Sequence, residues 1–253
     1  MEPFVPQRSI VRSIWGSGDT VLLIFAGASA EFALNKAVDW LYFTGRLPAD
    51  PLGRLFSTVT YAQQIVFADE ANALAAIDRI TSIHKGVEQQ RGASIPSTAY
   101  LDVLFMLVGY SISAYELLER KLLPEEKEEV FSVFFRVGQR MGLTGLPSTH
   151  EEFLRLRGRH LLQNLVYSKF SRDLYRQYRK SLGLVRYMVL LQTQVLLVPR
   201  RVRRLLKLPF IPLLYPVVQL YKISRLLHLD KGIKILLLPP RYRAQVFGLD
   251  SVT

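Results

Sequence analysis

The run TAYLDVLFMLVGYSISAYELL, residues 98–118, decides the fold class. Drawn as a helix, it carries apolar side chains around nearly its whole circumference, which is typical of a helix buried on all sides. Gly92 and Pro96 separate it from the segment before it. We therefore predict a central core helix against which the rest of the chain packs.

The segments on either side of this run also have helical spacing. Asp50 precedes one such segment and can accept hydrogen bonds from its first backbone N–H groups. Asp69-Glu70 places negative charge at the start of the next one. Strand-like alternation of useful length and a fixed-period repeat are both lacking. We expect helices over residues 20–42, 51–67, 70–87, 124–141, 150–165 and 174–198.

The predicted fold class is all-α. We expect one helical-bundle-like domain enclosing an apolar pocket, residues 1–198, and a basic, apolar helical extension packed on it, residues 199–253. Shorter apolar helices broken by prolines are expected in the extension. No linker rich in Gly, Ser or charge divides the chain, which favours one domain over two.

The positive charge lies in the C-terminal part of the chain. The whole sequence has a net charge of +12, and residues 151–253 hold 20 Lys and Arg against 5 Asp and Glu. Arg200, Arg201, Arg203, Arg204 and Lys207 precede an apolar stretch, which suits a helix on an anionic membrane surface. A solvated basic face with a docked helix explains the same pattern. Binding to nucleic acid is the weaker alternative, because no recognised nucleic-acid module accompanies the charge.

The N-terminal segment resembles a secretion signal in one respect. Arg8 and Arg12 precede the apolar run of residues 21–28. Trp15 and Asp19 lie before that run, and the helical pattern continues beyond it, so we interpret it as the first core helix. No segment has the roughly 18 uncharged apolar residues of a membrane-spanning helix, and we expect a cytoplasmic protein that can associate with a membrane surface.

Several kinds of chemistry are excluded by residues that the chain lacks. It has no cysteine, which removes disulfides, thiolate catalysis and cysteine-bound metals. It also lacks the standard nucleophile, phosphate-binding and dinucleotide-binding motifs. Its four histidines show no metal-clamping spacing. A metal-free hydrolase would therefore need a nucleophile and a base that the sequence does not reveal.

Among the four histidines, His84 is the candidate metal ligand. It shares an apolar helical stripe with Leu74, Ile77, Ile80 and Val87. One neutral imidazole on an apolar helix is enough to ligate a haem iron. On the pattern alone, the favoured explanation is a core histidine bonded to a backbone carbonyl.

The residues before and around His84 carry a family resemblance. The stretches DPLGRLFST (residues 50–58), IVFAD (65–69) and IHKGV (83–87) occur in this order. Together they resemble the latex-clearing rubber oxygenases and MpaB-type oxygenases, which are helical haem proteins. Weaker matches lie near Trp15-Gly16, at YEL (115–117), LPEEK (123–127) and LPPRYR (238–243), and at Gly248-Leu249.

This resemblance implies roles for three residues. Arg54 and Thr58 match the arginine and threonine that the family carries four residues apart on one helix, and His84 matches the haem-ligating histidine of the next helix. Because positions i and i+4 share a helix face, a guanidinium and a hydroxyl can meet one cofactor or ligand. Without the resemblance, Arg54 would be read as a surface ion-pair residue and Thr58 as a hydroxyl bonded to its own backbone.

Two departures from the family pattern limit what is carried over. Similar proteins often have His-Pro in the first core helix, where this chain has Ala26-Gly27-Ala28. The lysine that precedes the threonine in rubber oxygenases is Ser57 here. The second change implies an open or water-occupied distal iron position, and the two together weaken an assignment to polymer cleavage.

Four other residues are candidate partners in the pocket. Glu31 and Asp39 are possible distal bases if the first helix lines the pocket, and Tyr61 and Tyr110 are possible hydrogen-bond donors. Each is also explained as an ordinary surface charge or a packed aromatic ring.

The resemblance implies a haem b-dependent oxygenase, an oxidoreductase that acts with dioxygen on a small apolar substrate of isoprenoid or lipid type. His84 would hold the iron, and Arg54 and Thr58 would orient the bound groups. The alternative is a non-catalytic membrane-surface or lipid-binding protein with the same helical fold.

Overall fold

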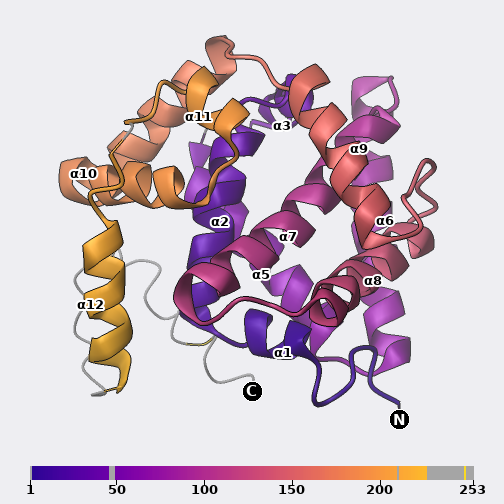
Figure 1. Cartoon of the computed structure of the whole chain (residues 1–253). Coiled ribbons are helices and arrows are strands. Elements are labelled where there is room, and N and C mark those ends of the chain that lie inside the picture. The colour runs from indigo at the N-terminus through magenta and orange to yellow at the C-terminus, as the bar shows by residue number, and fades with distance from the viewer. Residues whose placement is uncertain (1, 46–48, 210, 227–247, 249–253) are drawn as a thin grey trace.

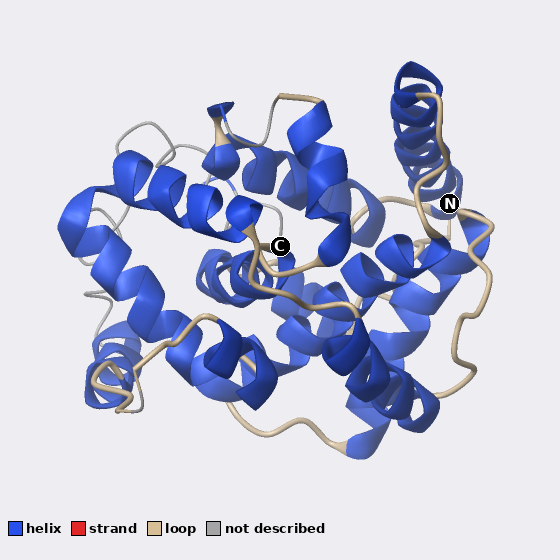
Figure 2. Ribbon diagram, turned by 90° about the horizontal axis from the view of Figure 1, so that it is seen from above, coloured by secondary structure: helices blue, strands red, loops and turns tan. Residues whose placement is uncertain are grey.

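The protein is all-α in the residues that its computed structural model describes, which are 2–45, 49–209, 211–226 and 248. Every regular element in these residues is a helix (Figure 2), and β-type pairing is limited to two isolated bridges. The predicted fold class is confirmed.

Helix α7 (Ser97–Leu118) is the centre of the molecule. Figure 1 shows it crossing the middle, with α2 (Gly18–Phe32) alongside, and α8 (Pro124–Arg140) and α9 (His150–Gln163) also pack on it. By length and composition it is the one helix in the described part of the chain that could cross a membrane. Of its most apolar 18-residue window, 56% is buried inside the protein, and Phe105 and Tyr110 are almost fully inaccessible, as expected of the predicted core helix.

The N-terminal segment contributes to the same core. Phe4 and Trp15, the latter at the end of α1 (Ile10–Trp15), are fully buried, and Trp15 Nε1 donates a hydrogen bond to Ser111 Oγ of α7 at 3.2 Å. The apolar run of residues 21–28 lies within α2, packed against α7. These residues therefore act as a core helix in this fold.

Helix α2, which corresponds to the helix predicted over residues 20–42, is shorter than predicted. It ends at Phe32, and the chain continues as a 3₁₀ turn η1 (Lys36–Val38) and a short helix α3 (Asp39–Phe43). Asn35 causes the break, because its side chain accepts a hydrogen bond from the Ala37 backbone N–H and donates one to Asp102 of α7. A short polar side chain that bonds the nearby backbone competes with helix propagation.

Helices α5 (Pro51–Val66) and α6 (Glu70–Arg91) pack against each other and carry the predicted site residues. Asp50 caps α5 as predicted, accepting from Gly53 N, and Asp69 at the start of α6 also accepts from Asn72 N. Helix α6 ends at Gly92, whose φ of 67° lies in the left-handed region that glycine tolerates best.

The C-terminal part is a long helix and two shorter ones. Helix α10 (Lys169–Leu197) is bent at Gly183, where φ is 72°, and is followed by α11 (Arg200–Leu205) and α12 (Tyr215–Leu226). Arg225 of α12 forms ion pairs with Glu119 and Asp19, and Lys222 Nζ donates to the Glu119 carbonyl, so α12 is tied to the body. The rest of the predicted extension, including residues 238–243, His228 and Leu249, lies outside the described residues.

Candidate functional site

The antiparallel pair α5 and α6 positions the three predicted site residues. Arg54 lies on the first turn of α5, Thr58 one turn later on the same face, and His84 on the fourth turn of α6. Helix α5 packs on α6, and the charge of Arg54 contributes to lowering the pKa of His84. Arg54 and Thr58 thus lie on a helix that packs against the helix of His84.

His84 is half-buried and has one unsatisfied ring nitrogen. Its Nδ1 atom is buried and has no hydrogen-bond partner. Burial, and then the charge of Arg54, lower the pKa of His84 below its ordinary value, while Glu88 acts in the opposite direction. The lowered pKa favours the neutral imidazole, and the neutral form is the one that binds a metal ion. The core-histidine interpretation requires a backbone carbonyl bonded to the ring, but Nδ1 has no such partner.

Arg54 and Thr58 are bonded to each other. Arg54 Nη1 donates to Ser57 Oγ at 2.9 Å and to Thr58 Oγ1 at 3.2 Å. Both hydroxyls in turn donate to the Arg54 carbonyl, at 2.8 and 3.3 Å. The threonine therefore does bond its own backbone, and it also orients the guanidinium. Ser57, which stands where rubber oxygenases have lysine, is part of the same arrangement.

Asp39 lies next to the helix that carries His84. Its Oδ2 atom is 2.7 Å from Nη2 of Arg91, which follows His84 by seven residues on α6. The Arg91 guanidinium also lies 4.0 Å from the ring centre of Trp40. Of the candidate carboxylates, Asp39 is therefore the one that contacts the His84 helix, but it is engaged with a cation.

Glu31 and Tyr110 belong to a different cluster. Glu31 is 3% exposed and forms a bidentate ion pair with Arg157 of α9, at 3.0 and 2.8 Å, and Tyr110 donates to it at 2.8 Å. Burial, and then the Glu31 charge, raise the pKa of Tyr110 well above its ordinary value. With every partner engaged, this cluster joins α2, α7 and α9, which is a structural role. Tyr61 is half-buried on α5.

Gly27 explains part of the departure from the family pattern in the first core helix. A Cβ atom at this position would lie 2.4 Å from the Tyr110 ring. The small residue therefore lets Tyr110 approach α2 and reach Glu31. Where similar proteins place a histidine, this chain has a close contact between two helices.

Three residues around His84 or on its helix face were not predicted from the sequence: Tyr100, Glu88 and Arg91. The ring of Tyr100 on α7 lies nearly perpendicular to the imidazole, with 5.2 Å between ring centres. Glu88 accepts from the Tyr100 hydroxyl at 3.4 Å and from Ile95 N at 2.8 Å. Burial, and then Glu88, raise the pKa of Tyr100 to about 12, so its hydroxyl stays protonated. Glu88 and Arg91 follow His84 at four and seven residues, a spacing that marks one helix face, whereas nothing in the sequence indicated Tyr100.

The remaining histidines have other surroundings. His160 Nδ1 lies 2.6 Å from Asp102, in a network with Asn35 and Asn164. His150 on α9 also has a buried unpartnered nitrogen, Nε2, and burial lowers its pKa. Among the described residues, no three His, Asp or Glu side chains cluster as metal ligands. A single histidine fits haem, because a porphyrin itself supplies the other in-plane ligands.

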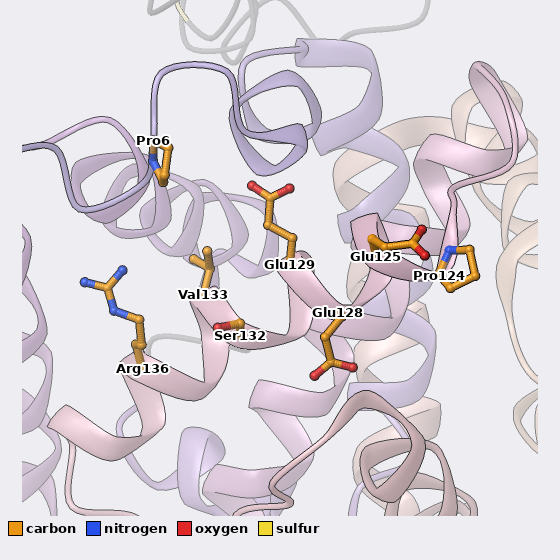
Figure 3. A pocket seen from close by; sticks show the side chains of 8 residues that line it. All are labelled: Pro6, Pro124, Glu125, Glu128, Glu129, Ser132, Val133 and Arg136. Carbon is orange, nitrogen blue, oxygen red and sulfur yellow. The ribbon is translucent and has the colours of Figure 1, made fainter.

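Two surface hollows lie away from His84. Figure 3 shows one along α8, where Glu125, Glu128 and Glu129 make an acidic lining beside Arg136. The second lies between α5 and α6 and includes Gln63 and Arg79. Neither contains His84, Arg54 or Thr58, and an acidic lining does not suit an apolar substrate.

The chain matches a known family over most of its length. The model of the family described as ER-bound oxygenase mpaB/B′/rubber oxygenase, catalytic domain, matches residues 14–228. No curated protein and no solved structure gave a significant match. The matched span includes α5, α6 and all three predicted site residues.

Proposed function

Because the chain belongs to the family of mpaB-type ER-bound oxygenase and rubber oxygenase catalytic domains, we propose that it is a haem b-dependent oxygenase whose iron is held by His84. The observation that carries the proposal is the buried Nδ1 atom of His84, which has no hydrogen-bond partner. Burial also lowers the pKa of His84, which favours the neutral imidazole. Leaving a buried polar atom unsatisfied costs about 1–3 kcal/mol, which a bound group would offset.

The surrounding residues fit this role. The edge contact from Tyr100 restrains the ring plane of His84, and the bond to Glu88 restrains Tyr100. Arg54 supplies a guanidinium oriented by Ser57 and Thr58. When bound, haem b would supply the dioxygen-binding and electron-transfer chemistry that this chain's own side chains lack.

The substrate that we propose is a small apolar molecule of isoprenoid or lipid type. The family's oxygenase chemistry and the apolar composition of the chain support this class. In this proposal Arg54 and Thr58 orient the reacting groups by hydrogen bonds, and dioxygen is the co-substrate.

The experiment is an absorbance spectrum of the purified protein after expression with haem available. We expect a Soret band in the wild type and loss of most bound haem in His84→Ala. His150→Ala is the matched control, because His150 also has a buried unpartnered nitrogen and a lowered pKa. Added imidazole should restore haem to His84→Gly by filling the vacated place. A colourless wild type, or a His84→Ala variant with full haem content, rules the proposal out.

A second candidate function, lipid binding without catalysis, is favoured by the surface of the C-terminal helices. Arg200, Arg201, Arg204 and Lys207 are exposed in or next to α11. Large apolar side chains are exposed just beyond them: Ile211, Leu213, Tyr215, Val217, Leu220 and Ile223. Arg203 differs, because its guanidinium donates to the Pro209 carbonyl and fixes the local turn.

Such a surface suits anionic headgroups beside acyl chains. Flotation with vesicles and an absorbance spectrum distinguish the two functions. Colourless protein that floats with anionic vesicles supports lipid binding alone, whereas a Soret band supports the oxygenase, with or without flotation.

A further inference from the structure

We propose that Arg91 is an anion-binding residue that holds the carboxylates of the haem ligated by His84. This inference rests on the proposed function and adds a second attachment point for the cofactor. Arg91 is seven residues beyond His84 on α6. Seven residues bring a helix back to the same face after a rise of about 10.5 Å. The two side chains therefore project from one face of α6, two turns apart.

The Arg91 guanidinium is held in place, but only some of its N–H groups have a partner. Nη2 is paired with Asp39 of α3 at 2.7 Å, and the group stacks at 4.0 Å on Trp40, with Phe43 at 5.5 Å. Nη1, by contrast, is buried and has no hydrogen-bond partner. A guanidinium loses little entropy on binding when it is already oriented, and its N–H groups form strong bonds to carboxylates.

Haem b is the ligand whose chemistry matches both residues. It combines an iron that takes an imidazole with two carboxylates on one edge of the ring, so a cation that binds them lies to one side of the ligating histidine. His84 offers the imidazole, and Arg91 offers a donor displaced along the same helix face. Arg54 is less suited to the carboxylates, because its Nη1 is already bonded to Ser57 and Thr58.

The test compares haem with its dimethyl ester, which keeps the iron and the ring but has no carboxylate charge. Apo-protein is titrated with each compound, and the two dissociation constants are measured by absorbance. We expect the wild type to prefer haem. In Arg91→Met, which keeps an aliphatic stem over Trp40, the preference should fall about 10-fold or more, since one hydrogen bond to a charged group is of this size. The ester should bind both proteins equally.

Arg79→Met is the matched control, since Arg79 is an exposed arginine on the same helix. It should keep the full preference for haem. Equal binding of haem and ester by the wild type, or an unchanged preference in Arg91→Met, overturns the inference. If Arg91→Met fails to fold by circular dichroism, Arg91→Lys decides: a reduced preference supports the inference, because an ammonium lacks the planar fork, and an unchanged one overturns it.

The outcomes also separate this inference from the proposed function. A wild type that binds neither compound contradicts the haem oxygenase itself. A wild type that binds haem with a preference independent of Arg91 leaves the oxygenase standing and removes only the role of Arg91.

Discussion

Glu31 and Arg157 form a bidentate ion pair inside the helical core, with side chains that are 4% and 10% exposed. Neither group retains much contact with water, and burial in a low-dielectric interior makes an unpaired charge costly. The pair, completed by Tyr110, connects α2 to α9 across α7. It is therefore a structural element whose strength can be measured directly.

Replacing Glu31 with glutamine should destabilise the protein by about 3–5 kcal/mol, because Arg157 would remain buried without its counter-charge. Urea denaturation followed by circular dichroism measures the change in the free energy of unfolding. Asp78→Asn is the control, since it breaks an ion pair with Arg140 whose side chains are 51% and 45% exposed, and it should cost far less. Equal losses of unfolding free energy in the two variants would show that the buried pair stabilises the protein no more than the exposed pair does.

The close approach of Gly27 to Tyr110 leads to a second prediction. Gly27→Ala would place a Cβ atom 2.4 Å from the ring, which cannot move away without straining its hydrogen bond to Glu31. We expect a loss of about 1–3 kcal/mol from overpacking. Gly158→Ala on α9 meets no atom within 4 Å and should be neutral or stabilising by up to about 1 kcal/mol, as alanine favours helices. Thermal denaturation of the two variants side by side checks the difference.

The ionisation of His84 gives a prediction with a defined sign. Folding lowers its pKa, mainly by burial and then by the charge of Arg54, so the folded state binds fewer protons than the unfolded state. The stability that depends on a neutral His84 is fully present above pH 6.5, the ordinary pKa, and declines as the pH falls below it toward the folded-state value. NMR titration of the imidazole in the apo-protein measures this pKa.

Variants of the neighbours should move that pKa in opposite directions. Arg54→Met removes a positive charge and should raise the pKa of His84, whereas Glu88→Gln should lower it further. Lys85→Met removes an exposed positive charge one residue away and serves as the control. The prediction is wrong if Arg54→Met leaves the titration of His84 unchanged, since that would place Arg54 outside its electrostatic range.

Much of the fold could be predicted from local sequence chemistry. The apolar circumference of residues 98–118, the caps at Asp50 and Asp69 and the proline at 199 are signals carried by a few neighbouring residues. The end of α2 at Phe32 was not predicted, because Asn35 interrupts the helix through Asp102, which is 67 residues away. The same holds for the bend at Gly183, where one glycine adopts a positive φ within an otherwise helical pattern.

The candidate site also combines residues that local sequence predicts with residues that depend on distant parts of the chain. Arg54, Thr58 and His84 are predicted because each lies within a recognisable stretch, and the packing of α5 on α6 places their two helices side by side. Periodicity could have suggested Glu88 and Arg91, which continue the face of His84. Tyr100 depends on how α7 approaches α6, and the pairing of Glu31 with Arg157 depends on α9, so neither is encoded locally.

The C-terminal helices allow a final prediction about membrane association. Arg200 and Arg201 are exposed at the start of α11, close in sequence to the exposed apolar residues that begin at Ile211. Each basic residue near an anionic bilayer contributes about 1 kcal/mol, so reversing both charges should weaken binding to vesicles rich in anionic lipid at least about 10-fold. Arg155→Glu/Arg159→Glu on α9 makes the same change in net charge at two other exposed arginines and should have a much smaller effect. Vesicle flotation at low and high salt measures both, and the difference between the two pairs should shrink in high salt as the charges are screened. Equal weakening by the two pairs would instead indicate attraction by the overall charge of the protein, and would remove α11 as the docking surface.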